Sequence, residues 1–353
     1  MTDVIVERVG ALGRLRLDRP KALNALTHGM VLAIDAALNE FSADPGLAAV
    51  LLTGEGDRGL CAGGDLRGLY ENPGTAFAEK FWRDEYRLDS RIANYEKPFV
   101  AVMDGITMGG GVGLAGHAAH RIVTERSRIG MPETGIGYLP DVGGTWLLPR
   151  APGQIGTYLG LTGAQVGAAD AIFCGLADVM VPMQAHPDLI DALSALPPDA
   201  GDAGVRDVID RLARDPGAPP LAQHRETIDR CFAFDMIDEI LSALAADGSD
   251  FAAATRETLL TKSPSSLVLT LCLLRRGRRS PNLEACLERE FHASLALLEE
   301  GDFREGIRAA VIDKDKSPRW KPPNLEAVDP ARIARWLEKR AEPVFSAART
   351  GPV

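Results

Sequence analysis

The chain has few of the features that mark several large classes of protein. Its 353 residues include only five cysteines, which are widely spaced and form no CxxC pair. This usage is typical of reduced thiols in a cytosol, and it offers no zinc site. No apolar run approaches the roughly 18 residues that a membrane span requires, and no basic segment followed by an apolar one opens the sequence. We therefore expect a cytoplasmic protein that does not span a membrane.

Basic residues are also in short supply. Lys and Arg total 39 against 49 Asp and Glu, a formal charge of −10. This balance argues against general binding of nucleic acid or of an anionic membrane. With 46% hydrophobic and 25% charged residues, the composition is that of an ordinary globular protein with one large core and an accessory lobe.

The first part of the chain predicts alternating strands and helices. Residues 4–9 and 12–17 predict a hairpin around Gly10. Apolar residues at helical spacing from Met30 to Phe41 predict a helix, with Thr27 as its N-cap.

Buried strands follow that helix. The apolar runs 47–53 and 98–103 suit strands buried on both faces, and each ends in a glycine-rich loop. Residues 121–124 and 129–131 are candidates for shorter strands. The recurring order of strand, glycine loop and helix predicts an α/β fold.

The pattern becomes helical after Arg150. Residues 155–161 and 164–173 predict helices, and 179–181 predict a closing strand. Residues 195–204 are rich in Pro, Gly, Ala and Asp and suggest a linker. We therefore divide the chain into a core over residues 1–194 and a C-terminal helical region over residues 205–353.

Two carboxylates stand out because their surroundings are apolar. Glu133 and Asp141 lie in the segment 131–144, which is otherwise made of apolar residues, Gly, Pro, Tyr and Thr. A carboxylate without solvent or a cation has a raised pKa, as a general acid, base or nucleophile needs near neutral pH. The triplet Gly109–Gly111 just upstream lets backbone N–H groups approach a ligand. Together these features suggest chemistry on a carbonyl group.

Structural explanations for these residues stay open. Asp141 follows a proline and precedes Val-Gly-Gly, where an aspartate commonly caps a turn. Glu85 has Arg83 and Arg87 beside it, so a surface helix with ion pairs explains it almost as well as a binding site does. For Glu133 the structural explanation is a helix N-terminus or a salt bridge, and it is weaker because the neighbouring residues offer no cation.

Four segments in this order resemble the crotonase superfamily of acyl-CoA enzymes, namely 17–26, 61–67, the glycine triplet and 131–144. Within that superfamily, the chain is similar to the 3-hydroxyisobutyryl-CoA hydrolase branch in the segments 81–86, 104–114, 140–144 and 302–322. The resemblance covers most of the chain and is weakest over residues 197–252.

The resemblance implies a crotonase-like spiral of ββα units, followed by C-terminal helices that cover or extend an acyl-CoA site. It implies hydrolysis of the thioester of 3-hydroxyisobutyryl-CoA, or of a related short 3-hydroxyacyl-CoA, as in valine breakdown. Neither a metal nor a cofactor is expected, since coenzyme A is part of the substrate. Superfamily members often form trimers, so a homo-oligomer is possible.

Carried onto this sequence, the resemblance also implies residue roles. The backbone N–H groups of Gly64 and Gly110 would form an oxyanion hole. Glu133 would be the central carboxylate, attacking the thioester carbonyl or acting as a base towards water, and Asp141 would assist it. Glu85 would accept a hydrogen bond from the 3-hydroxyl of the substrate.

Two further positions refine this interpretation. Arg67 lies in a matching motif and is a candidate for binding the phosphate or pantetheine side of the substrate. Enoyl-CoA hydratases carry a second glutamate where this chain has Gly113, which favours hydrolysis over hydration. We expect the freed space to let Glu85 and Asp141 converge beside Glu133. An enoyl-CoA hydratase or isomerase is the alternative, and a non-catalytic acyl-CoA-binding protein is a third hypothesis.

Overall fold

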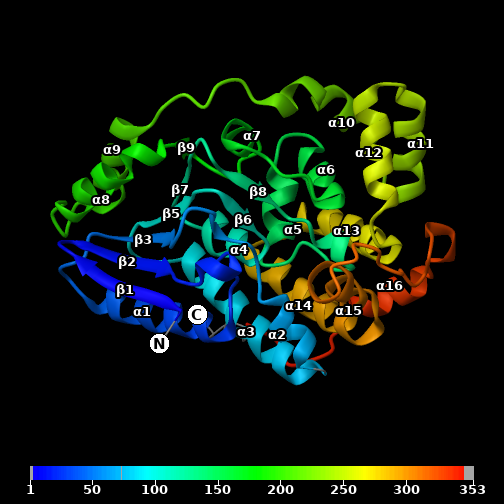
Figure 1. The fold of residues 1–353 in the computed structure, drawn as a ribbon, viewed down its shortest axis with the longest axis horizontal. Coiled ribbons are helices and arrows are strands. Elements are labelled where there is room, and N and C mark those ends of the chain that lie inside the picture. The colour runs from blue at the N-terminus through cyan, green and yellow to red at the C-terminus, as the bar shows by residue number, and fades with distance from the viewer. Residues whose placement is uncertain (1–2, 73, 346–353) are drawn as a thin grey trace, which may run out of the picture.

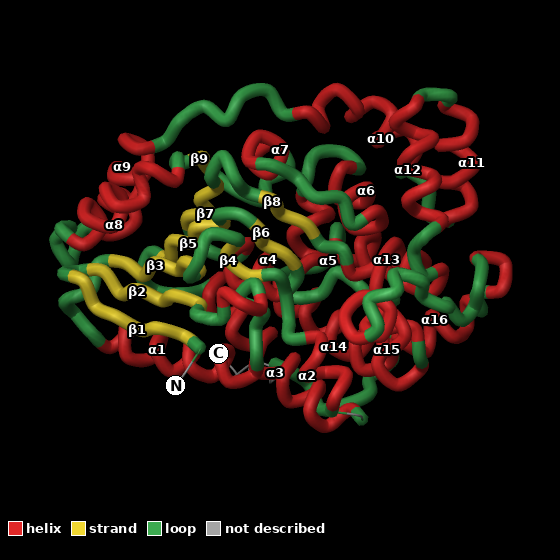
Figure 2. The backbone as a smooth tube through the Cα atoms, viewed as in Figure 1, coloured by secondary structure: helices red, strands yellow, loops and turns green. Residues whose placement is uncertain are grey.

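Two sheets form the centre of the molecule (Figures 1 and 2). The computed structural model describes residues 3–72 and 74–345. The larger sheet has the strand order β1-β2-β3-β5-β7-β9, and the smaller sheet has the order β4-β6-β8. Among the strand pairs of the described residues, β1 and β2 form an antiparallel hairpin and the other pairs are parallel. The strands are β1 (Val4–Val9), β2 (Leu12–Leu17), β3 (Ala49–Gly54), β4 (Gly59–Cys61), β5 (Phe99–Met103), β6 (Ile106–Met108), β7 (His120–Val123), β8 (Arg128–Gly130) and β9 (Val179–Met180).

The α/β prediction is confirmed, and the hairpin and the strands buried on both faces lie where the sequence places them. In β3, Val50 and Leu52 join the main hydrophobic core, whereas Ala49 and Leu51 join a second cluster on the opposite face. Helices α1 (His28–Ala43), α2 (Leu66–Glu71), α3 (Thr75–Ala93) and α4 (Gly110–Gly116) alternate with these strands. Thr27 caps α1 as predicted, accepting a hydrogen bond from the Met30 amide.

The next part of the chain departs from the predicted bounds. It contains α5 (Gly144–Leu147), α6 (Ile155–Thr162), α7 (Ala168–Phe173), α8 (His186–Ser194) and α9 (Gly201–Leu212). The predicted helix over 164–173 begins late because Val166 pairs with Ile129 of β8 through two backbone hydrogen bonds. The predicted linker over 195–204 is too long, since α9 begins at Gly201.

Helices α8 and α9 cover one face of the larger sheet (Figure 1). Val205, Val208 and Ile209 of α9 are buried in the same cluster as Leu51 of β3 and Leu189 of α8. The proposed division of the chain at residues 194 and 205 stays a prediction, but α9 packs with the sheet and not with the helices that follow it.

The remaining helices lie at the other end of the molecule (Figure 1). They are α10 (Arg225–Cys231), α11 (Ile237–Asp247), α12 (Asp250–Leu260), α13 (Pro264–Gly277), α14 (Leu283–Glu300), α15 (Asp302–Ile307) and α16 (Pro330–Trp336). Helix α14 packs against α3, and α15 packs against α2. Residues 346–353 of the predicted helical region lie outside the described residues. None of the described helices has the length and hydropathy of a membrane span.

Helix α4 packs so closely on β4 that it needs glycine. A methyl group on Gly111 would lie 2.5 Å from the Cys61 carbonyl oxygen and 2.8 Å from Cys61 Cβ. We predict that Gly111→Ala lowers the free energy of unfolding by about 1–3 kcal/mol, because backbone must move to admit the methyl group. Urea denaturation measures this change.

Gly29 supplies the matched control. It is exposed in α1, and the nearest atom to an added methyl group is Thr27 Oγ1 at 3.8 Å. Gly29→Ala should raise the free energy of unfolding by about 0.4–1 kcal/mol. Equal stabilities for Gly111→Ala and the wild type would show that the α4/β4 contact can relax freely.

Candidate active site

The parallel strands of the smaller sheet bring three predicted site residues together. Gly64 follows the end of β4, Gly110 follows the end of β6, and Glu133 follows the end of β8. Since β4 pairs in parallel with β6, and β6 with β8, the three segments leave the sheet at the same edge. Each turn of the ββα spiral thus contributes one segment to a common site.

These segments enclose a cavity of about 150 Å³. Helix α3 contributes one side of it, and the C-terminal helices close it through Phe303 of α15. The lining consists of Ala62, Gly63, Gly64, Leu66, Leu69, Phe81, Trp82, Glu85, Met108, Gly109, Gly110, Pro132, Glu133, Ile136, Tyr138, Asp141, Val142 and Phe303. Most of these side chains are apolar, so its few carboxylates are poorly solvated.

Two backbone donors at the cavity are free within the described structure. The N–H groups of Gly64 and Gly110 donate to no protein acceptor there. The two glycines lie close together, because a methyl group on Gly110 would be 3.5 Å from Gly64 N and 2.7 Å from Glu85 Oε1. A side chain at Gly110 would therefore fill the space that the two donors face.

Glu133 begins a short 3-10 turn, Glu133–Ile136, and is buried. Its Oε2 atom has no hydrogen-bond partner, and its Oε1 atom would lie 2.9 Å from a methyl group on Gly109. Burial and the nearby charge of Asp141 raise the pKa of Glu133 well above its usual value. The ionised form of Glu133 is thus destabilised beside the two free donors.

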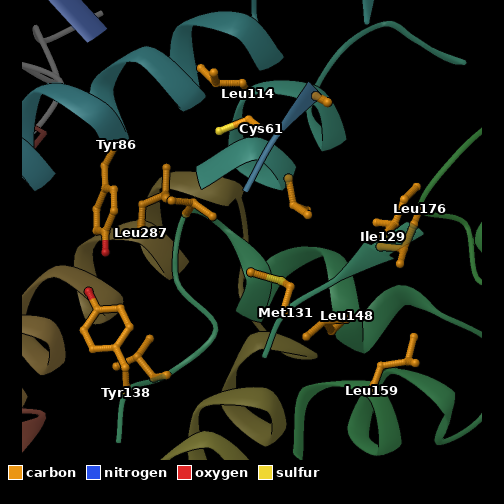
Figure 3. Close-up of a cluster of buried hydrophobic side chains, with 14 of the residues drawn as sticks. Cys61, Tyr86, Leu114, Ile129, Met131, Tyr138, Leu148, Leu159, Leu176 and Leu287 are labelled. Atoms are coloured by element: carbon orange, nitrogen blue, oxygen red, sulfur yellow. The ribbon is translucent and has the colours of Figure 1, made fainter. Parts of the chain in front are cut away.

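Asp141 is also buried, but it has partners. Its Oδ2 atom accepts hydrogen bonds from the Tyr86 hydroxyl at 2.7 Å and from the Tyr138 hydroxyl at 3.1 Å. Figure 3 shows the two hydroxyls pointing towards one another. Burial raises the pKa of Asp141 to about 6, although both hydroxyls act to lower it. Ser294 of α14 completes this network, with its Oγ 2.6 Å from the Tyr138 hydroxyl.

The structure places Glu85 and Arg67 differently. Glu85 lines the cavity, and burial followed by the charge of Asp141 raises its pKa. The surface-helix explanation for Glu85 is therefore wrong. Arg67 does not line the cavity, since its side chain is half exposed and contacts the Glu71 carboxylate at 3.6 Å and the Val311 carbonyl at 3.4 Å.

The space beside Gly113 holds a residue that the sequence analysis missed. A methyl group on Gly113 would meet Val142 Cβ at 2.7 Å and the Asp89 carboxylate oxygens at 3.0 and 3.1 Å. Glu85 and Asp141 do line one cavity with Glu133, as expected, but the space beside Gly113 itself holds Asp89 and Val142. Asp89 lies one helical turn after Glu85 on α3, a spacing that was visible in the sequence.

Several other residues at the site were not predicted. Tyr86 and Tyr138 hold Asp141, and Glu290 of α14 accepts hydrogen bonds from the backbone of residues 143 and 145. The ring of Tyr138 stacks on those of Trp82 and Phe303, with centroid separations of 5.7 and 4.2 Å, and the Trp82 and Phe303 rings also contact each other at 6.3 Å. No periodic pattern in the sequence indicates these contacts, which join segments up to 221 positions apart.

No group of three or more potential metal-binding side chains occurs among residues 3–72 and 74–345. The five cysteines are all free thiols. Cys61 borders the glycine loop. Burial destabilises its thiolate and so raises the pKa of Cys61 to about 12. This thiol is therefore a poor nucleophile at neutral pH.

Comparison with known proteins gives consistent matches over nearly the whole chain. The family model described as enoyl-CoA hydratase/isomerase matches residues 12–337. The mitochondrial 3-hydroxyisobutyryl-CoA hydrolase of Danio rerio is 40% identical over 336 residues, 93% of this chain and 87% of that protein. The Homo sapiens protein of the same name is 38% identical over 334 residues, 92% of this chain and 86% of that protein.

Solved structures show the same fold. A structure titled carnitinyl-CoA dehydratase from Mycobacterium thermoresistibile has a TM-score of 0.91 and 41% identity, covering 98% of this chain and 99% of that one. One titled enoyl-CoA hydratase from Rhodobacter sphaeroides has a TM-score of 0.86 and 46% identity, covering 95% and 97%. The crotonase-like fold inferred from the sequence motifs is thus confirmed.

The environment of Asp89 leads to a stability prediction. Both of its carboxylate oxygens are buried without a hydrogen-bond partner. Burial, followed by the charges of Glu85, Asp141 and Glu290, raises the pKa of Asp89 well above its usual value. Above about pH 4 the unfolded chain releases this proton and the folded chain keeps it, so stability falls as the pH rises.

Asp89→Asn removes this linkage while keeping the shape of the side chain. We predict that the variant is more stable than the wild type at pH 7, by at most about 1.4 kcal/mol for each pH unit between the unfolded pKa of about 4 and pH 7. The gain should shrink towards pH 4. Denaturation at both pH values measures it, and a variant less stable than the wild type at pH 7 would mean that Asp89 is paired as an anion.

Proposed function

The chain belongs to the enoyl-CoA hydratase/isomerase family, and on that premise we propose that it hydrolyses the thioester of 3-hydroxyisobutyryl-CoA to the free acid and coenzyme A. Relatives named for this activity are 38–40% identical to the chain. The observation that carries the proposal is the position of Glu133, which lines one cavity with Gly64 and Gly110, whose backbone N–H groups are free in the described structure.

The two N–H groups are the proposed oxyanion hole. The oxygen of a thioester gains negative charge when a nucleophile adds to the carbonyl carbon, and fixed donors stabilise that charge without reorganising. Each such donor is worth about 2.7–4 kcal/mol of the barrier. The close approach of Gly64 and Gly110 supports their acting on one oxygen atom.

Glu133 supplies the nucleophile in this proposal. It either adds its own carboxylate oxygen to the thioester carbon or takes a proton from a water that adds there. The tetrahedral intermediate then collapses and expels the coenzyme A thiolate. With water as the attacking group this yields the free acid directly, whereas attack by Glu133 leaves an acyl-Glu133 anhydride, which water then hydrolyses to the free acid and the Glu133 carboxylate. Asp141 assists by handling the water proton or by returning a proton to the thiolate. Its hydrogen bonds with Tyr86 and Tyr138 support an oriented, ionised carboxylate before the reaction.

Two residues are proposed to bind the substrate. Glu85 lies on the cavity wall, where it would accept a hydrogen bond from the 3-hydroxyl of the acyl group. Arg67 is solvent-exposed outside the cavity, so its proposed contact would be with the coenzyme A part of the substrate. No metal or further cofactor enters the proposal.

Enoyl-CoA hydration is the second candidate. The titles of the two solved structures at 41% and 46% identity favour it. Gly113 argues against it, because the second glutamate of hydratases is absent from this position. We propose the cytoplasm as the location, although the named relatives are mitochondrial, and a homo-oligomer stays a prediction.

Glu133→Gln tests the proposal. We predict that the wild type releases free thiol from 3-hydroxyisobutyryl-CoA and that the variant loses on the order of 10³-fold or more in kcat with its fold intact, since the amide can neither attack nor accept the proton. Thiol release and circular dichroism measure the two properties. Loss of crotonyl-CoA absorbance without thiol release would instead identify a hydratase, and acyl-CoA binding without any turnover would support the non-catalytic hypothesis.

The pKa of Asp141 predicts a pH dependence. Burial raises this pKa to about 6, and the two tyrosine hydroxyls donate to the ionised form. Above pH 7 Asp141 is therefore ionised, and below pH 6 it takes up a proton. We predict that kcat/KM falls below pH 6 in the wild type and that the midpoint of this limb moves to lower pH in the residual activity of Asp141→Asn. That activity reports Glu133 alone, whose pKa burial still raises but the charge of Asp141 no longer does. A wild-type rate that increases as the pH falls would mean that protonated Asp141 is the active form.

A further inference from the structure

The turn that follows Asp141 has a strained backbone. Val142 has a φ of +49°, a left-handed conformation that β-branched residues rarely adopt. The turn is closed by a hydrogen bond from the Gly144 amide to the Asp141 carbonyl at 2.6 Å. Such strain persists only where the surrounding structure holds it, and it is concentrated at functional sites. The contacts of residues 142–145 must therefore stabilise this conformation.

Glu290 of α14 provides most of these contacts. Its Oε2 atom accepts a hydrogen bond from the Gly143 amide at 2.8 Å. Its Oε1 atom accepts from the Thr145 amide at 2.9 Å and from the Thr145 hydroxyl at 2.5 Å. The side chain is fully buried, and no cation pairs with it within the described structure. Three donors from one turn thus compensate for burying the carboxylate.

His117 holds the same turn from the other side. Its Nε2 atom lies 2.8 Å from the Val142 carbonyl oxygen. Burial lowers the pKa of His117 to about 4, so the ring is neutral at pH 7 and Nε2 is the N–H donor. The turn is therefore fixed between α4, which precedes His117, and α14, which carries Glu290.

We propose that Glu290 is a positioning residue for the reaction: by binding the 143 and 145 amides it fixes the turn that points the Asp141 carboxylate into the cavity. The inference rests on the proposed role of Asp141. It gives α14 a part in the chemistry without contact to the substrate, since Glu290 does not line the cavity.

Glu290→Gln is the direct test. The amide nitrogen of glutamine would face one of the N–H groups that Glu290 now accepts from, so the turn would lose a contact and shift. We expect kcat for thiol release from 3-hydroxyisobutyryl-CoA to fall by about 10- to 100-fold, because small displacements of a catalytic group cost that much. KM should stay within about twofold, because the cavity walls are unchanged.

Glu284→Gln is the matched control. Glu284 is on the same helix and partly buried, and it accepts hydrogen bonds from Ser90 and Asn94 of α3 and its C-cap. Within the described residues it forms no hydrogen bond with residues 141–145. Replacing the Glu284 carboxylate by an amide should leave kcat within about twofold of the wild type. Melting curves should show that all variants are folded.

A double-mutant cycle with Asp141→Asn separates positioning from a general structural role. If Glu290 acts through Asp141, adding Glu290→Gln to Asp141→Asn should slow turnover by less than about threefold further. Losses that multiply, or wild-type kcat in Glu290→Gln alone, would overturn the inference. Wild-type kcat in Asp141→Asn would instead refute the proposed role of Asp141, and the inference would fall with it.

A second variant decides the question if Glu290→Gln does not fold. Thr145→Val keeps the shape of the side chain and removes only the hydroxyl donor to Glu290. We expect a smaller loss of kcat with unchanged KM, which is absent in the Asp141→Asn background. A Thr145→Val enzyme with wild-type kcat would then overturn the inference.

Discussion

The burial of carboxylates without a cation is the constraint on which the site depends. Glu85, Asp89, Glu133, Asp141 and Glu290 are all buried, and none forms an ion pair within the part of the chain that the structure describes. Their mutual repulsion and the loss of solvent favour protonation, so the surroundings decide which of them is ionised. Hydroxyl and backbone donors stabilise the charge on Asp141 and Glu290, whereas Glu133 and Asp89 have unpartnered oxygens. The fold thereby gives chemically similar carboxyl groups different tendencies to be ionised.

The C-terminal helices are part of this arrangement. Phe303 of α15 closes the cavity, Ser294 of α14 extends the network around Asp141, and Glu290 fixes the turn behind it. The spiral alone would present Gly64, Gly110 and Glu133 at a sheet edge. The helices bury that edge, which raises the pKa values that the proposed chemistry uses.

Local patterns predicted the parts of the structure that depend on neighbouring residues. Alternating and continuous apolar runs identified β1, β2, β3 and β5, and the position of Thr27 identified the start of α1. The motif around Glu133 and Asp141 identified two lining residues of the cavity, as their apolar neighbours suggested. The roles of these residues stay predictions. Contacts between distant segments could not be predicted from such patterns. The positions of Glu290 and Asp89 at the site depend on how α14 and α3 pack. Arg67 faces solvent although its motif is at the site.

A crystal structure of Glu133→Gln with 3-hydroxyisobutyryl-CoA bound would test the proposed geometry of thioester hydrolysis. We expect the thioester oxygen at about 2.7–3.1 Å from both Gly64 N and Gly110 N, with its carbonyl carbon either about 3–3.5 Å from the side chain at position 133 or separated from it by one water. A thioester oxygen that contacts neither backbone donor, or an acyl group bound outside this cavity, would contradict it.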